Sequence, residues 1–184
     1  MPDDPGIEVL LNQIDVATGL NLFYLALYSA LALPDVAAAL SSPNGQTNGA
    51  LYAAWFDRFV APKYQMGGGP SLRGEDCYSL RCSMLHEGTA QRGSAPRART
   101  ARYDRFLFIP GNRIHNIEFN HCNIGGAWMN VLVLSIPIFT RTITDGVRTW
   151  LPTVQGTPEF LANYEKFMRL RPNGQPPFGG VLVM

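Results

Sequence analysis

The chain has 184 residues, a formal net charge of +1 at pH 7, 46% apolar residues and 16% charged residues. Its ten Phe, seven Tyr and three Trp exclude a disordered or collagen-like chain. A chain of this length can bury roughly 70% of the surface that its unfolded form exposes, so one core needs no disulfide or metal to hold it.

The first predicted helix spans residues 7–33 and ends before Pro34, because apolar residues first follow a helical period and then fill nearly every position. Residues 16–34 carry no charge and are just long enough to cross a membrane. Thr18 and Asn21 interrupt this segment, however, and no Lys or Arg flanks it. A buried core helix is the better interpretation, and we expect no membrane partner.

Further helices are predicted at residues 34–40, 50–60 and 74–87. The last of these has acidic residues in its first turn, where the helix dipole favours them, and Gly88 is placed to end it. We expect three residues on its core-facing arc to pack against the first helix: Cys77, Leu80 and Met84. Together these helices predict a helical bundle over residues 1–88.

The pattern changes in the second half of the chain. Residues 89–101 are rich in Ser, Pro, Gly and Arg and predict a mobile connector. Residues 102–109 and 113–121, joined by a Pro-Gly-Asn turn, predict a hairpin. Residues 128–136 predict a third strand.

Two helices complete the predicted fold. Ser135 is placed to cap the first, and the second begins after Thr157 with a proline in its first turn. The whole pattern predicts one α+β domain over residues 1–184, with a helical N-terminal half and a small antiparallel sheet covered by helices over residues 102–184. The tryptophans are all expected in the core: Trp55, Trp128 and Trp150.

Cysteine and histidine usage bears on location and cofactors. The three cysteines cannot all pair within one chain and indicate reduced thiols, and the acidic N-terminus is unlike a signal peptide, so we expect a cytoplasmic protein. A shared metal site is the alternative, but its candidate ligands follow no recognised zinc spacing, so we expect no metal and no cofactor. Those candidates are His86, His115, His121 and Cys122.

Basic residues concentrate in the middle of the chain. Between Arg58 and Arg105 there are nine of them against four acidic residues, which gives a local net charge of +5 and suits an anionic partner. Within this stretch, Arg81 and His86 lie near the end of one predicted helix. Arginine is always charged and donates hydrogen bonds to phosphate, and histidine exchanges protons near neutral pH. Such a pair could cleave RNA without a metal, with histidine moving a proton at the ribose 2′-hydroxyl or at the leaving oxygen.

The segment LRCSMLHEG, residues 80–88, resembles the Arg-x4-6-His helix ending of the HEPN family, and the resemblance covers residues 71–88. It implies a helical bundle that forms a homodimer and acts as a metal-independent endoribonuclease of a toxin–antitoxin or antiphage type. Arg81 and His86 would then be the catalytic pair. Five further residues would bind the RNA substrate: Glu87, Arg92, Arg97, Arg99 and Arg102.

The geometry of a helix limits how the side chains of this pair can meet. Residues five apart on an ideal helix point about 140° apart. Arg81 and His86 should therefore meet only if the last turn unwinds or if two copies of the helix face each other in a dimer.

Two other interpretations remain open. Arg81 could be a structural cation paired with Glu75 or Asp76, with His86 capping the helix, and the other arginines could belong to a solvated loop. The chain would then be a non-catalytic helical module that binds a protein partner.

Overall fold

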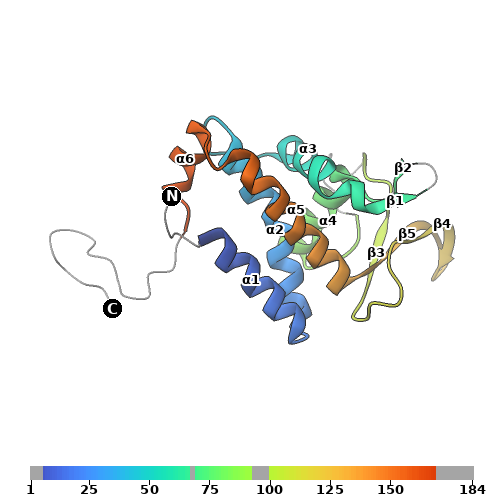
Figure 1. Ribbon diagram of the computed structural model, residues 1–184. Coiled ribbons are helices and arrows are strands. Elements are labelled where there is room, and N and C mark those ends of the chain that lie inside the picture. The colour runs from blue at the N-terminus through green and yellow to red at the C-terminus, as the bar shows by residue number, and fades with distance from the viewer. Residues whose placement is uncertain (1–5, 67–68, 93–99, 169–184) are drawn as a thin grey trace.

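The computed structural model describes residues 6–66, 69–92 and 100–168, and its first helical stretch is two helices, not one. Helix α1 (Gly6–Gly19) and helix α2 (Phe23–Ser41) run side by side and are joined by a sharp reversal (Figure 1). Asn21 adopts a left-handed conformation with φ of 60°, and the Leu22 amide donates to the carbonyl of Ala17 at 2.8 Å. These bonds close the turn within three residues, so the prediction of one helix over residues 7–33 is wrong.

Helix α2 continues through Pro34, which the sequence had suggested as a break. A proline removes one backbone hydrogen bond but can remain inside a helix that packing holds on several sides. Pro34 is itself buried, as are eight other residues of the helix. By length and composition, α2 is the one helix among the described residues that could span a membrane, and half of its most apolar 18-residue window is buried inside the protein.

Helices α3 (Gly49–Phe59) and α4 (Gly74–Glu87) cross closely. A Cβ atom added at Gly74 would lie 2.2 Å from the carbonyl oxygen of Ala53, so this crossing requires a glycine. Between the two helices lie a short 3-10 helix and two paired two-residue strands: η1 (Ala61–Tyr64), β1 (Gln65–Met66) and β2 (Gly69–Pro70). Helix α4 has its predicted bounds, and Gly88 ends it with φ of 67°. Its arc is buried as predicted: Cys77, Leu80 and Met84.

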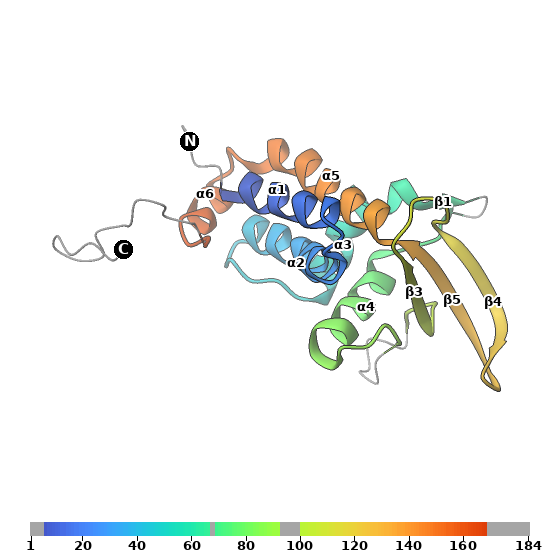
Figure 2. The ribbon, with the colours of Figure 1, turned by 90° about the horizontal axis from the view of Figure 1, so that it is seen from below.

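The three-stranded sheet is mixed and has the order β3-β5-β4 (Figure 2). Its strands are β3 (Arg105–Ile109), β4 (Ile117–Ile124) and β5 (Ala127–Ser135). Strand β5 pairs in parallel with β3 and antiparallel with β4, so the predicted hairpin between residues 102–109 and 113–121 is wrong. The apolar run at residues 131–134 suits a strand that is covered on both faces, and β5, at the centre of the sheet, has residues 131–135 buried without interruption.

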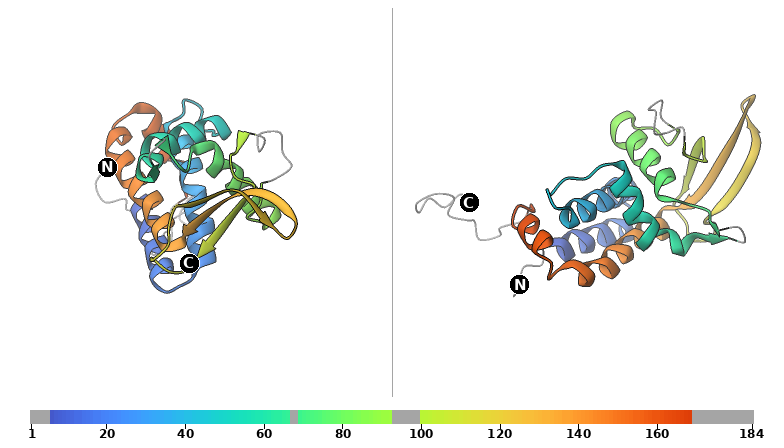
Figure 3. Two further views of the ribbon diagram at one scale, coloured as in Figure 1. Left: turned by 90° about the vertical axis from the view of Figure 1, so that its right-hand side faces the viewer. Right: turned by 90° about the horizontal axis from the view of Figure 1, so that it is seen from above.

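The two faces of the sheet differ. Phe106, Leu132 and Leu134 belong to the same core as the helices. The opposite face exposes Leu107, Ile117 and Phe119. The hairpin of β4 and β5 extends beyond the helices (Figure 3).

Trp128 lies on that hairpin and does not belong to the core. It is 62% exposed and stacks on His121, with ring centroids 4.7 Å apart. The expectation that all three tryptophans are core residues is therefore wrong for Trp128.

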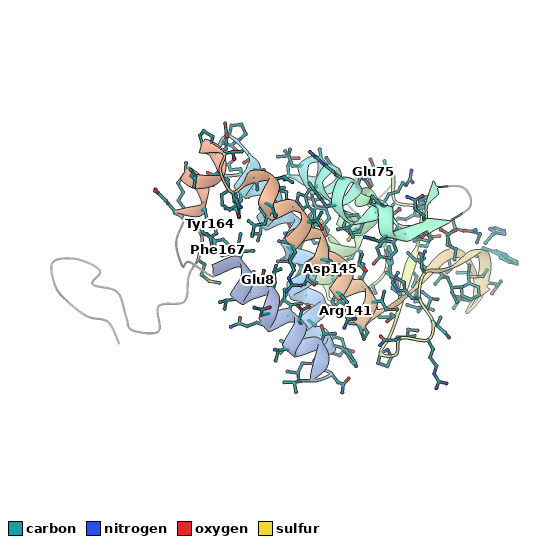
Figure 4. The ribbon with its side chains drawn as sticks, in the orientation of Figure 1. Glu8, Glu75, Arg141, Asp145, Tyr164 and Phe167 are labelled. Carbon is teal, nitrogen blue, oxygen red and sulfur yellow. The ribbon has the colours of Figure 1, made fainter. Side chains whose placement is uncertain are left out.

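The last two helices are capped as predicted. The Ser135 hydroxyl accepts from the Ile138 amide at the start of α5 (Ile136–Val154), and Thr157 caps α6 (Pro158–Tyr164) in the same way. Helix α5 packs along α1 and α2. Nε of Arg148 on α5 lies 3.1 Å from Oε1 of Glu8 on α1. Figure 4 labels Glu8, and it also labels Asp145 of α5. The α+β class is thus confirmed, with a mixed sheet in place of the antiparallel one.

The predicted connector, residues 89–101, is described only at its two ends, because residues 93–99 lie outside the described residues. The Phe106 amide donates to the carbonyl of Ala90, and the Arg92 amide donates to the carbonyl of Asp104, each at 2.8 Å. The described start of the connector is therefore held against the start of β3, not loose in solvent.

Candidate functional site

Arg81 and His86 meet on the surface of α4. Nη1 of Arg81 lies 3.3 Å from Nε2 of His86, and the helix stays regular through Glu87. The long arginine side chain spans the angle between the two positions. The expectation that the helix must unwind, or that a second copy must supply one partner, is therefore wrong: one chain brings the pair together.

Asp35 of α2 fixes the orientation of Arg81. Its Oδ2 accepts a 2.8 Å hydrogen bond from Nε, and the side chains of Arg81 and Asp35 are 23% and 14% exposed. Burial raises the pKa of Asp35 and Arg81 opposes that rise. Burial alone would lower the pKa of Arg81, but Asp35 and Cys82 raise it above its ordinary value. The guanidinium is thus a fixed cation with one edge on Asp35 and another toward His86.

Besides Asp35, the buried groups near Arg81 include two that are uncharged. The hydroxyl of Tyr52 and the thiol of Cys77 lie 3.3 Å apart and are fully buried. Burial raises the pKa of both groups well above neutrality. The pKa of Tyr78 is also raised, first by burial and then by Cys82. Arg81 keeps its partner Asp35 at 2.8 Å, so an anion would meet the guanidinium through the edge that faces His86.

His86 gives the site its accessible face. Its side chain is exposed, as is that of Glu87 beside it. In the neutral form of His86, Nε2 can accept a hydrogen bond from Nη1 of Arg81, or from a hydroxyl group that takes its place. The site therefore brings together a cation that can donate hydrogen bonds to a phosphate and an imidazole that can gain and lose a proton.

The other residues predicted to bind substrate have different surroundings. Nη2 of Arg92 lies 2.6 Å from Oδ1 of Asp104, and Nη2 of Arg102 lies 3.0 Å from Oδ2 of the buried Asp76. Both cations are thus engaged in ion pairs within the fold. Arg97 and Arg99 lie outside the described residues.

Each remaining metal-ligand candidate has a contact of its own. His115 accepts from the Ser135 amide at 3.1 Å through Nδ1, His121 stacks on Trp128, and the Cys122 thiol donates to the carbonyl of Met129 at 3.3 Å. Within the described residues, no three His, Cys, Asp or Glu side chains are grouped so as to hold a metal ion.

Asp35 is the site residue that sequence reasoning missed. It lies 46 residues from Arg81, and the alternative partners considered for Arg81, Glu75 and Asp76, are not the ones used. One signal was available: Asp35 is an acid inside a long uncharged run, and a carboxylate that folding brings into a core needs a partner.

Comparisons with known proteins add no information about the fold or the site. No protein-family model matches the sequence, and neither curated proteins nor solved structures gave a match. Within the described residues, the chain is an α+β protein with six α-helices and a three-stranded mixed sheet.

Proposed function

We propose that this protein acts on RNA as a metal-independent endoribonuclease, with Arg81 and His86 as its catalytic residues. The observation that carries this proposal is the 3.3 Å contact between Nη1 of Arg81 and Nε2 of His86 on an accessible surface. The resemblance of residues 71–88 to the HEPN helix ending supports the same assignment. A cytoplasmic location and a role in a toxin–antitoxin or antiphage system belong to this proposal.

The proposed reaction is an intramolecular transesterification. His86 takes the proton of a ribose 2′-hydroxyl, and the 2′ oxygen forms a bond to phosphorus as the bond from phosphorus to the 5′ oxygen breaks. Arg81 stabilises the charge that builds on the phosphoryl oxygens. The departing 5′ oxygen takes a proton from water. The products are a 2′,3′-cyclic phosphate and a 5′-hydroxyl end.

Substrate binding would extend from this pair toward the basic stretch of the chain. Glu87 is the exposed neighbour of His86, Arg92 lies in the described start of the connector, and Arg102 directly follows the connector. Both arginines would contact phosphate through the edges that their ion pairs with Asp104 and Asp76 leave open. Arg97 and Arg99 complete the proposed RNA-binding set. A homodimer also remains part of the proposal, although the catalytic pair is complete in one chain.

A second candidate is the non-catalytic module that binds a protein partner. The corner between α1 and α2 favours it, because large apolar side chains cluster there in solvent: Val16 is 58% exposed, Leu20 65%, Tyr24 80% and Leu25 63%. Exposed apolar patches of this kind commonly mark interaction surfaces.

RNA cleavage in EDTA tests the primary proposal. Purified protein is incubated with mixed RNA, and the new ends are mapped. We expect cyclic phosphate ends from the wild type and loss of cleavage in Arg81→Ala and in His86→Ala. Arg141→Ala, which removes an exposed arginine on α5 (Figure 4), is the matched control and should cleave normally.

Cleavage that persists in the His86→Ala variant would refute the assignment. Folded wild-type protein that leaves RNA intact would favour the second candidate.

A further inference from the structure

A pocket of about 660 Å³ opens between α2, α3 and α5. Its volume is in the range of small-molecule sites. Its walls are mainly apolar, and they include Leu51, Trp55, Phe59, Trp150 and Val154. Neither Arg81 nor His86 lines it, so this pocket is separate from the site described above.

Two tryptophans in the wall differ in the hydrogen bonding of their indole N–H groups. Trp55 and Trp150 meet edge to face with centroids 6.3 Å apart. Nε1 of Trp150 donates to the hydroxyl of Ser41 at 3.1 Å. Nε1 of Trp55 is buried and has no hydrogen-bond partner among the described residues, although the residue is only 6% exposed. Because this atom has almost no accessible surface, a molecule in the pocket cannot reach it, and the tryptophans offer the pocket only their ring faces and edges.

Arg58 supplies a positive charge to the same pocket. It lines the pocket from α3, and its guanidinium carbon lies 5.0 Å from the ring centroid of Phe59. Its side chain is exposed, and no carboxylate in the described part of the chain forms an ion pair with it. Arg73, Arg81, Arg92, Arg102 and Arg148 each pair with an acid, whereas Arg58 shares its lack of an ion pair within the described residues with Arg105, Arg113 and Arg141; among these four, Arg58 is the one that lines this pocket.

We propose that this pocket binds an apolar monoanion, a small molecule with an aromatic or acyl body and one carboxylate. The body would lie against Trp55, Phe59 and Trp150, which offer ring faces and edges. The carboxylate would pair with Arg58, whose planar fork matches its two oxygens.

A neutral or cationic ligand fits these observations less well. A neutral apolar molecule would use the aromatic wall but leave Arg58 unpaired, and a cation would be repelled by it. The proposal does not depend on the RNA-cleaving function, because the two sites share no residue.

Calorimetric titration with a pair of matched probes tests the proposal. Naphthalene-2-carboxylate and naphthalene-2-methanol have the same ring system, and only the first carries a charge. We expect the wild type to bind the carboxylate about tenfold more tightly than the alcohol, which is a usual size for one charge-assisted contact. Arg58→Met keeps the side-chain length and should abolish this preference, whereas Arg141→Met should leave it unchanged.

Circular dichroism confirms that each variant is folded. The proposal is overturned if the wild type binds neither probe, if it binds both equally, or if Arg58→Met keeps the preference for the carboxylate.

Discussion

Oδ2 of Asp35 lies 2.8 Å from Nε of Arg81, and this ion pair joins the middle of α2 to α4. Because the pair orients the guanidinium, Asp35→Ala should slow RNA cleavage about tenfold or more. The free energy of unfolding should fall by only about 1–2 kcal/mol, since a partly buried charged hydrogen bond is lost. Asp35→Asn keeps an acceptor for Nε and should recover part of the rate. Wild-type cleavage by Asp35→Ala would show that the orientation of Arg81 does not matter.

The contact between Gly74 and Ala53 predicts a position that tolerates no side chain. A Cβ at Gly74 would lie 2.2 Å from a backbone oxygen, so Gly74→Ala must separate α3 from α4 and should cost about 3 kcal/mol or more. Gly19→Ala is the control, because a Cβ there has no atom within 4 Å. Urea denaturation of the two variants compares them, and equal midpoints would contradict the close crossing.

Asp76 is a second position at which we expect a substitution to destabilise the fold. Its carboxylate is fully buried and accepts from the Arg102 amide at 2.7 Å, from Nε at 3.1 Å and from Nη2 at 3.0 Å. Asp76→Ala should lower the free energy of unfolding by about 3 kcal/mol, because it leaves these donors without their acceptor. Thermal unfolding measures the loss. An Asp76→Ala variant as stable as the wild type would mean that Arg102 is not held by this carboxylate and is available for RNA.

His115 predicts how stability depends on pH. Burial lowers its pKa below the ordinary value of 6.5, and its Nδ1 accepts a hydrogen bond from the Ser135 amide. The unfolded chain therefore binds a proton at His115 more readily than the folded chain does. The resulting stability is present above pH 6.5 and is lost as the pH falls through the folded pKa.

His115→Asn keeps an acceptor but cannot titrate, so its free energy of unfolding should fall less than that of the wild type between neutral and acid pH. Parallel slopes for the two proteins over that interval would exclude His115 as the cause.

Local signals in the sequence predicted the helices well. The acidic first turn and Gly88 predicted the bounds of α4, and Ser135 and Thr157 predicted two caps, because each of these effects acts within a few residues. The break at Asn21 was missed because the apolar pattern continues on both sides of it, and the pattern does not report the backbone angle.

Strand pairing could not be predicted from the same signals. The three strands were expected in nearly the right places, but alternation within a strand does not say which strand lies beside it. A tight turn after β3 suggested the nearest partner. The structure instead places β5 beside β3, since the most apolar strand gains most from the centre of the sheet.

The candidate site, too, could be predicted only in part from the sequence. The motif that contains Arg81 and His86 lies within one helix and could be found by reading along the chain. Asp35 could not, because its contact depends on how α2 packs against α4.

The central place of β5 also determines when the sheet can form during synthesis. Strand β3 leaves the ribosome before β4, but its partner β5 emerges last. Until Ser135 has been made, the apolar side chain of Phe106 has no finished sheet around it. Such a nascent chain would expose an unpaired strand, which is the kind of segment that chaperones recognise. A translational pause between Ile109 and Ser135 would therefore lengthen the interval in which the growing chain can aggregate.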